Sequence, residues 1–78
     1  MHLEIITPEK SIFKGEIDSA IFPGTEGSFG VLPNHSPIIS TLKKGDISVV
    51  DENKKSNLFA INGGVVEVSN NKIIVLAE

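Results

Sequence analysis

Apolar residues recur at every second position along much of this 78-residue chain. In His2–Thr7, Leu3 and Ile5 share one face and Glu4 lies on the other, which is the alternation of a half-buried strand. Glu16–Phe22 alternates in the same way. Further short runs rich in β-branched residues occur at Asp46–Asp51, Leu58–Ile61, Val65–Val68 and Lys72–Ala77. No window has the spacing of an amphipathic helix, so the pattern predicts an all-β domain.

Residues that favour turns separate these runs at Lys44-Gly45, Glu52–Lys55, Asn62–Gly64 and Ser69–Lys72. Asn70 and Asn71 suit the positive φ of a type I′ hairpin turn. Gly63 and Gly64 also allow close approach of two backbones, or a bulge, at the entry to the next strand. Closely spaced turns between short strands predict one domain, residues 1–78, built as an antiparallel sandwich or barrel with two facing sheets. We expect its core to include Ile5, Ile17, Val49, Ile61 and Val66.

The segment 22–37, with the sequence FPGTEGSFGVLPNHSP, holds three of the four prolines and three of the seven glycines. Proline fixes φ, and glycine permits backbone angles that are closed to other residues. The segment is therefore predicted to have a defined shape. It carries apolar Phe29, a candidate anchor for a docked partner, and His35. We expect this segment to do more than connect two strands.

Composition excludes several classes of function. The net charge is −3, and the chain has no arginine and only four aromatic residues, all phenylalanine. It therefore lacks the basic, aromatic surface of a nucleic-acid-binding protein. There is no cysteine and only two histidines, so no metal site is expected. No apolar run reaches the ~20 residues of a bilayer span and no signal peptide is present, which predicts a soluble, cytoplasmic chain.

Two candidate catalytic or ligand-binding patterns fail on spacing. The glycines at 24, 27 and 30 match neither a dinucleotide fingerprint nor a P-loop, and no helix follows them. Adjacent His35 and Ser36 would point to opposite faces of an extended chain, which does not suit a nucleophile and its base. We expect no catalytic or cofactor-binding residue. His35 is predicted either to bond nearby backbone or to lie at an interface.

Residues 22–45, FPGTEGSFGVLPNHSPIISTLKKG, closely resemble the signature of the epsilon subunit of bacterial F-type ATP synthase. The flanking sequences agree with that family in order. LEIITP at 3–8 resembles its first strand, INGGVVEV at 61–68 its Gly-Gly strand, and KIIVLA at 72–77 its last strand. The resemblance covers essentially the whole chain.

The resemblance implies a flattened β-sandwich that serves as a noncatalytic rotor subunit of the central stalk. In the family, this domain links the gamma subunit to the c ring and couples ion translocation to ATP synthesis. The implied location is peripheral, on the cytoplasmic face of the bacterial inner membrane. The alternative is a free-standing β-sandwich that binds some other protein. The family usually continues into a C-terminal helical hairpin; the chain ends at Glu78, so a form without that hairpin is expected.

Position by position, the resemblance assigns two interfaces. Its c-ring interface comprises Gly27, Ser28 and Phe29, and its gamma interface comprises Thr7, His35 and Ser40. The family often has an acidic residue where this chain has Ser28. A hydrogen-bonded or backbone contact is therefore expected to replace the charge at that position.

Overall fold

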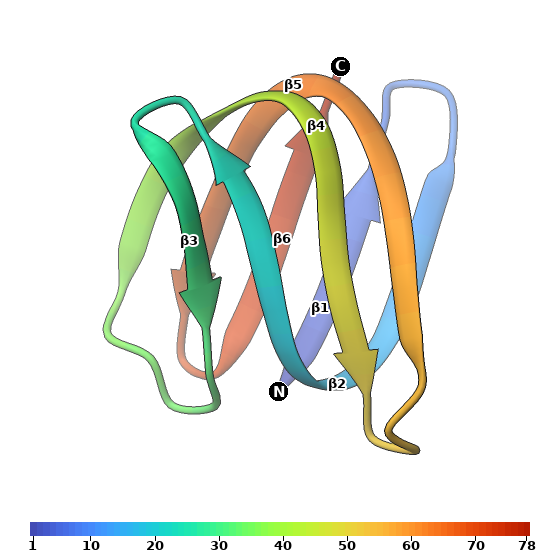
Figure 1. Cartoon of the computed structure of the whole chain (residues 1–78), viewed down its shortest axis with the longest axis vertical. Helices are drawn as coiled ribbons and strands as arrows, with labels where there is room; N and C mark the ends of the chain where they lie inside the picture. The colour runs from blue at the N-terminus through green and yellow to red at the C-terminus, as the bar shows by residue number, and fades with distance from the viewer.

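The computed structural model describes residues 1–78 and consists of strands joined by short turns (Figure 1). The strands are β1 His2–Ile6, β2 Ser11–Gly24, β3 Gly27–Val31, β4 Ile38–Asp51, β5 Ser56–Ser69 and β6 Lys72–Ala77. The all-β prediction is confirmed. No α-helix with the length and apolar character of a bilayer span is present.

One continuous sheet makes both layers of the sandwich. Its strand order is β1-β6-β5-β4-β2-β3, and an additional pairing of β1 with β2 closes it on itself. The sandwich prediction is confirmed, and the molecule is flattened, with principal extents of 26 × 24 × 18 Å. The two facing layers belong to one continuous sheet, and one of its pairings, that of β1 with β6, is parallel.

The long strands β4 and β5 pass from one layer to the other without interruption. Figure 1 shows both strands arching together over one end of the molecule. They remain paired through this arch, with Lys43 opposite Gly63 and Gly45 opposite Ile61. The turns predicted at Lys44-Gly45 and Asn62–Gly64 are therefore wrong. The alternative interpretation of Gly63 and Gly64, a close backbone approach within a strand, is confirmed by the packing of Gly64 against Leu76.

The space between the layers is filled entirely by apolar side chains. All five residues predicted for the core are buried, and no buried side-chain polar atom lacks a hydrogen-bond partner. The core comprises Leu3, Ile5, Ile17, Ala20, Phe22, Val31, Leu42, Ile47, Val49, Ile61, Val66, Val68, Ile73, Val75 and Ala77. Burial of these apolar side chains is the main stabilising term for so small a domain.

The turns follow the predicted chemistry where they connect neighbouring strands. Asn70 and Asn71 have φ of 52° and 59°, as a type I′ turn requires. In the β4–β5 turn, the Asp51 carboxylate accepts hydrogen bonds from the backbone N–H groups of Asn53 and Lys55. The ammonium group of the intervening Lys54 pairs with Asp18 of β2, and this hydrogen bond raises the pKa of Lys54. Because the pair is exposed, we assign it little stability.

Candidate functional site

The segment 22–37 begins with a tight hairpin between β2 and β3. A two-residue turn, Thr25-Glu26, joins the paired Gly24 and Gly27. The turn is attached to β4, because the Thr25 N–H donates to the Thr41 carbonyl at 3.0 Å and their hydroxyl oxygens are 2.8 Å apart. The hairpin is therefore held in one position relative to the body of the sandwich.

The three residues assigned to a c-ring contact lie together at the start of β3. Gly27 and Ser28 are exposed, whereas Phe29 is half-buried. The Phe29 ring packs on Phe22, with ring centroids 5.7 Å apart, and so helps to cover the core. Only part of this ring is therefore free to contact a partner.

The loop between β3 and β4 contains His35. Its backbone is tied to the β5–β6 turn, because the Asn34 N–H donates to the Asn71 side-chain oxygen at 2.8 Å. His35 Nδ1 lies 2.8 Å from the Ser36 carbonyl oxygen and donates to it. The local-backbone interpretation of His35 is thus confirmed. The side chain is only partly buried, so part of the ring remains open to a neighbouring molecule.

The other two residues assigned to a gamma contact lie on separate elements. Ser40 is half-buried on β4, opposite Val66 of β5. Thr7 belongs to the β1–β2 turn, where its hydroxyl and backbone N–H both bond to Lys10. Figure 1 shows that this turn lies at the same end of the molecule as the β2–β3 turn, whereas the β3–β4 loop lies at the opposite end. Thr7 and His35 therefore do not form one compact patch.

An exposed apolar face was missed by the sequence reasoning. It lies on the outer side of β4, β5 and β6. There Ile39 of β4 lies opposite Glu67 of β5, and Val65 of β5 lies opposite Leu76 of β6. Ile39 and Leu76 are 73% and 58% exposed, respectively. Exposed groups of large apolar residues typically mark protein contacts. A sequence signal was available, because uninterrupted apolar pairs such as 38–39 and 65–66 place apolar side chains on both faces of a strand.

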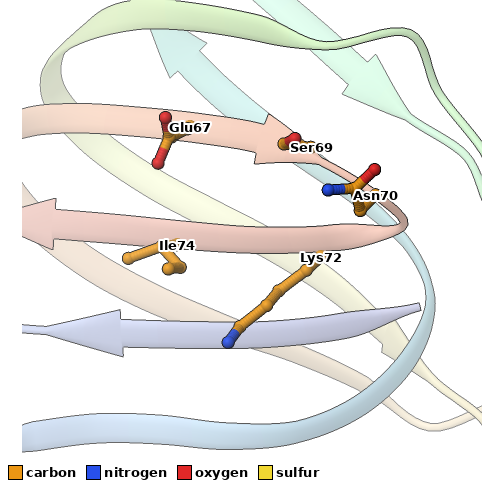
Figure 2. Close-up of a pocket in the computed structure, with 5 residues that line it drawn as sticks. All are labelled: Glu67, Ser69, Asn70, Lys72 and Ile74. Carbon is orange, nitrogen blue, oxygen red and sulfur yellow. The ribbon is translucent and has the colours of Figure 1, made fainter.

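A surface hollow beside the β5–β6 turn does not have the character of an active site. Figure 2 shows this hollow, in which Glu67 and Ser69 lie on β5, Lys72 and Ile74 lie on β6, and Asn70 lies in the turn. The side chains do not converge on a common point. The hollow has a volume of about 240 Å³ and a single apolar lining residue. Small-molecule sites are usually larger, more enclosed and more apolar.

The one cluster of titratable groups joins β1 to β2. His2 Nδ1 lies 2.8 Å from a Glu16 carboxylate oxygen, and His2 Nε2 lies 3.2 Å from Glu4. The amine of Met1 lies 3.5 Å from the other oxygen of Glu16. The hydrogen bond from His2, aided by the nearby positive amine, lowers the pKa of Glu16. The cluster links β1 to β2 across the pairing that closes the sheet. No group of three or more side chains has the arrangement of a metal site.

Comparison with known sequences gives matches along the full chain. Residues 1–78 match the family described as ATP synthase, Delta/Epsilon chain, beta-sandwich domain. The ATP synthase epsilon chains of Campylobacter concisus and Campylobacter curvus are 46% and 45% identical over all 78 residues. The chain therefore spans only 60% of the length of each of these relatives.

Solved structures share the fold. A chain in the Euglena gracilis mitochondrial ATP synthase structure, which contains OSCP, F1 and the c ring, superposes with a TM-score of 0.90 at 25% identity. The match covers 96% of this chain and 48% of that one. A chain in the central stalk and c-ring structure from Tetrahymena thermophila has a TM-score of 0.82 at 18% identity, covering 99% of this chain and 62% of that one. By sequence and by fold, the chain belongs to the ATP synthase delta/epsilon family, within its β-sandwich domain.

Proposed function

We propose that this chain is a noncatalytic central-stalk subunit of an F-type ATP synthase, linking the gamma subunit to the c ring. The observation that carries the proposal is the family match over residues 1–78, together with epsilon chains at about 45% identity. A rigid sandwich with an anchored hairpin and no converging polar pocket suits transmission of torque better than chemistry. In this role the chain couples ion translocation to ATP synthesis.

The c-ring contact is assigned to Gly27, Ser28 and Phe29. Support comes from their position in a hairpin that two bonds between Thr25 and Thr41 hold in place. Less conformational entropy is lost when such a preorganised segment docks. Ser28 brings no charge to this contact. Assembly should therefore depend less on salt here than in relatives with an acidic residue at that position.

The gamma contact is assigned to His35, Ser40 and Thr7. The partial exposure of His35 supports this assignment, as does the position of Ser40 near the start of β4, the strand that follows the loop containing His35. Thr7 has weaker support because its polar groups are used within its own turn. The protein would then be peripheral at the cytoplasmic face of the bacterial inner membrane, held there by its partners.

Cysteine cross-linking in the intact synthase tests these contacts. With Ser28→Cys, we expect a cross-link to a cysteine in the polar loop of the c subunit. With His35→Cys, we expect a cross-link to gamma. Asn53→Cys, on the exposed β4–β5 turn away from the hairpin, is the control and should react only with a solvent probe.

The alternative function is a free-standing β-sandwich that binds an unrelated protein. The exposed apolar face on β4, β5 and β6 is compatible with it, since that face indicates a partner without identifying one. Purification separates the two functions. Recovery of this chain without gamma and c subunits, together with failure of both cross-links, would favour the alternative.

A further inference from the structure

The arch of β5 contains the one Asn-Gly pair of the chain, Asn62-Gly63 (Figure 1). Asparagine side chains are chemically labile, because the backbone nitrogen of the next residue can attack the side-chain amide. Glycine at that next position has no side chain to shield its nitrogen. Whether the reaction occurs in the folded protein depends on how the sheet holds the two reacting groups.

The side-chain amide of Asn62, which would be attacked, is not held by the structure. Asn62 is exposed, and its amide takes part in none of the side-chain hydrogen bonds of the molecule. The register of β4 with β5 passes from Lys43 opposite Gly63 to Gly45 opposite Ile61. Asn62 therefore lies where the pairing of the two strands is interrupted.

The backbone nitrogen of Gly63, which would attack, is also free. The Gly63 carbonyl accepts a hydrogen bond from the Glu78 N–H at 3.0 Å. Both polar groups of a residue in an antiparallel strand face the same neighbour, so the Gly63 N–H also faces β6. The ladder with β6 ends one pair earlier, at Gly64 opposite Ala77, and no hydrogen bond outside the ladders uses the Gly63 N–H. No acceptor therefore holds this nitrogen in place.

We propose that Asn62 is a site of spontaneous deamidation in the folded protein. The Gly63 nitrogen forms a bond to the side-chain carbonyl carbon of Asn62, the bond from that carbon to the amide nitrogen breaks, and ammonia leaves with the proton that Gly63 releases. Water then opens the resulting succinimide at either of its two carbonyl groups, which leaves aspartate or isoaspartate at position 62. The reaction needs only water.

The two products should affect the arch differently. Aspartate keeps the length of the main chain and adds one negative charge. Isoaspartate carries the main chain through the former side chain and so adds one methylene group to β5 just before Gly63. The following residue, Gly64, lies so close to β6 that a Cβ on it would be 2.3 Å from the carbonyl oxygen of Leu76. β5 has no room to shift there, so isoaspartate should disturb the arch more than aspartate does.

Peptide mapping by mass spectrometry, after incubation of the folded chain in mildly alkaline buffer, tests the site. Deamidation at Asn62 should be several-fold faster than at Asn57, which is exposed on the same strand but is followed by Leu58. The rate should rise with pH, because the attacking nitrogen must lose its proton. The same mapping in urea gives the rate in the unfolded chain. Conversion of Asn62 in urea but not in the folded chain would show that the sheet protects this pair, and would overturn the proposal.

Variants at position 62 test the effect on the arch. Asn62→Gln should remove the reaction at this site, since a longer side chain forms the cyclic imide much more slowly. Asn62→Asp reproduces the aspartate product. The isoaspartate fraction of the aged parent, separated by chromatography, should melt at a lower temperature than Asn62→Asp. Equal melting temperatures would overturn the expected disturbance of β5. None of these measurements involves a partner, so their failure would leave the proposed function unchanged.

Discussion

Replacement of Gly64 by alanine should be among the most damaging single-methyl changes in this protein. Gly64 has φ of 153°, and a Cβ built there would lie 2.3 Å from the carbonyl oxygen of Leu76 and 3.0 Å from the Cα of Ala77. Both neighbours are backbone atoms of β6, so no side-chain rotation can relieve the clash. The β5 and β6 strands must separate locally.

The magnitude follows from two separate costs. The unfavourable φ of a non-glycine residue costs about 1–3 kcal/mol. Loss of roughly two ladder hydrogen bonds costs about 1–3 kcal/mol more. We therefore expect Gly64→Ala to reduce the free energy of unfolding by about 2–6 kcal/mol, against a total of roughly 4–12 kcal/mol for a domain of this size. The corresponding fall in Tm is on the order of 10–40 °C.

Two other glycines provide matched controls in urea and thermal unfolding. Gly27 has φ of 126° but no atom within 4 Å of a built Cβ, so its alanine variant bears only the conformational cost. That variant should lose about 1–2 kcal/mol. Gly30 has neither a positive φ nor a close neighbour, and its alanine variant should stay within about 0.5 kcal/mol of the parent. If Gly64→Ala destabilises no more than Gly27→Ala, the close approach of β5 and β6 does not limit stability and the reasoning is refuted.

Three further outcomes are expected. Ile17→Ala, which empties a site that is 2% exposed, should cost about 2–5 kcal/mol in urea unfolding, and a loss below about 1 kcal/mol would contradict the packing described. Because the pKa of Glu16 is lowered in the folded protein, its contribution to stability is present above the unfolded-state pKa and is lost as the pH falls through the folded-state pKa. The His2→Ala variant should therefore lose less unfolding free energy than the parent when the pH falls below about 4.5. An identical dependence of unfolding free energy on pH in both proteins would count against a stabilising role for this cluster. Titration calorimetry with Mg-ATP should show no heat of binding, since the glycines at 24, 27 and 30 lack P-loop spacing, and micromolar affinity would refute that interpretation.

Much of the fold was predictable because strand faces depend on a period of two. Leu3 and Ile5 are both buried as the alternation of His2–Thr7 requires. The Asn70-Asn71 turn was predictable because few residues tolerate two successive positive φ angles. The extent of β4 and β5 was not. Lys44-Gly45 and Asn62–Gly64 have turn-forming residues, but pairing between the two strands keeps each extended through its bend.

The candidate site was predictable only in part. The resemblance selected Gly27, Ser28 and Phe29, and the structure places them in one anchored hairpin. It could not indicate that the Phe29 ring turns inward onto Phe22, because that depends on the register of β2 with β3. The exposed apolar face was visible as uninterrupted apolar pairs, but only the strand order brings these pairs together on one surface.

By itself, the sequence determined the fold class, the core-facing positions, the short hairpin turns and the family, because each depends on local periodicity, local backbone preference or a contiguous motif. The tertiary structure decided that one sheet folds over to make both layers, that β1 joins β6 in parallel, and that β3 remains an open edge. These features arise from pairing between segments distant in sequence. No local preference selects among the possible partners, and the choice is made only when the whole apolar core is buried at once.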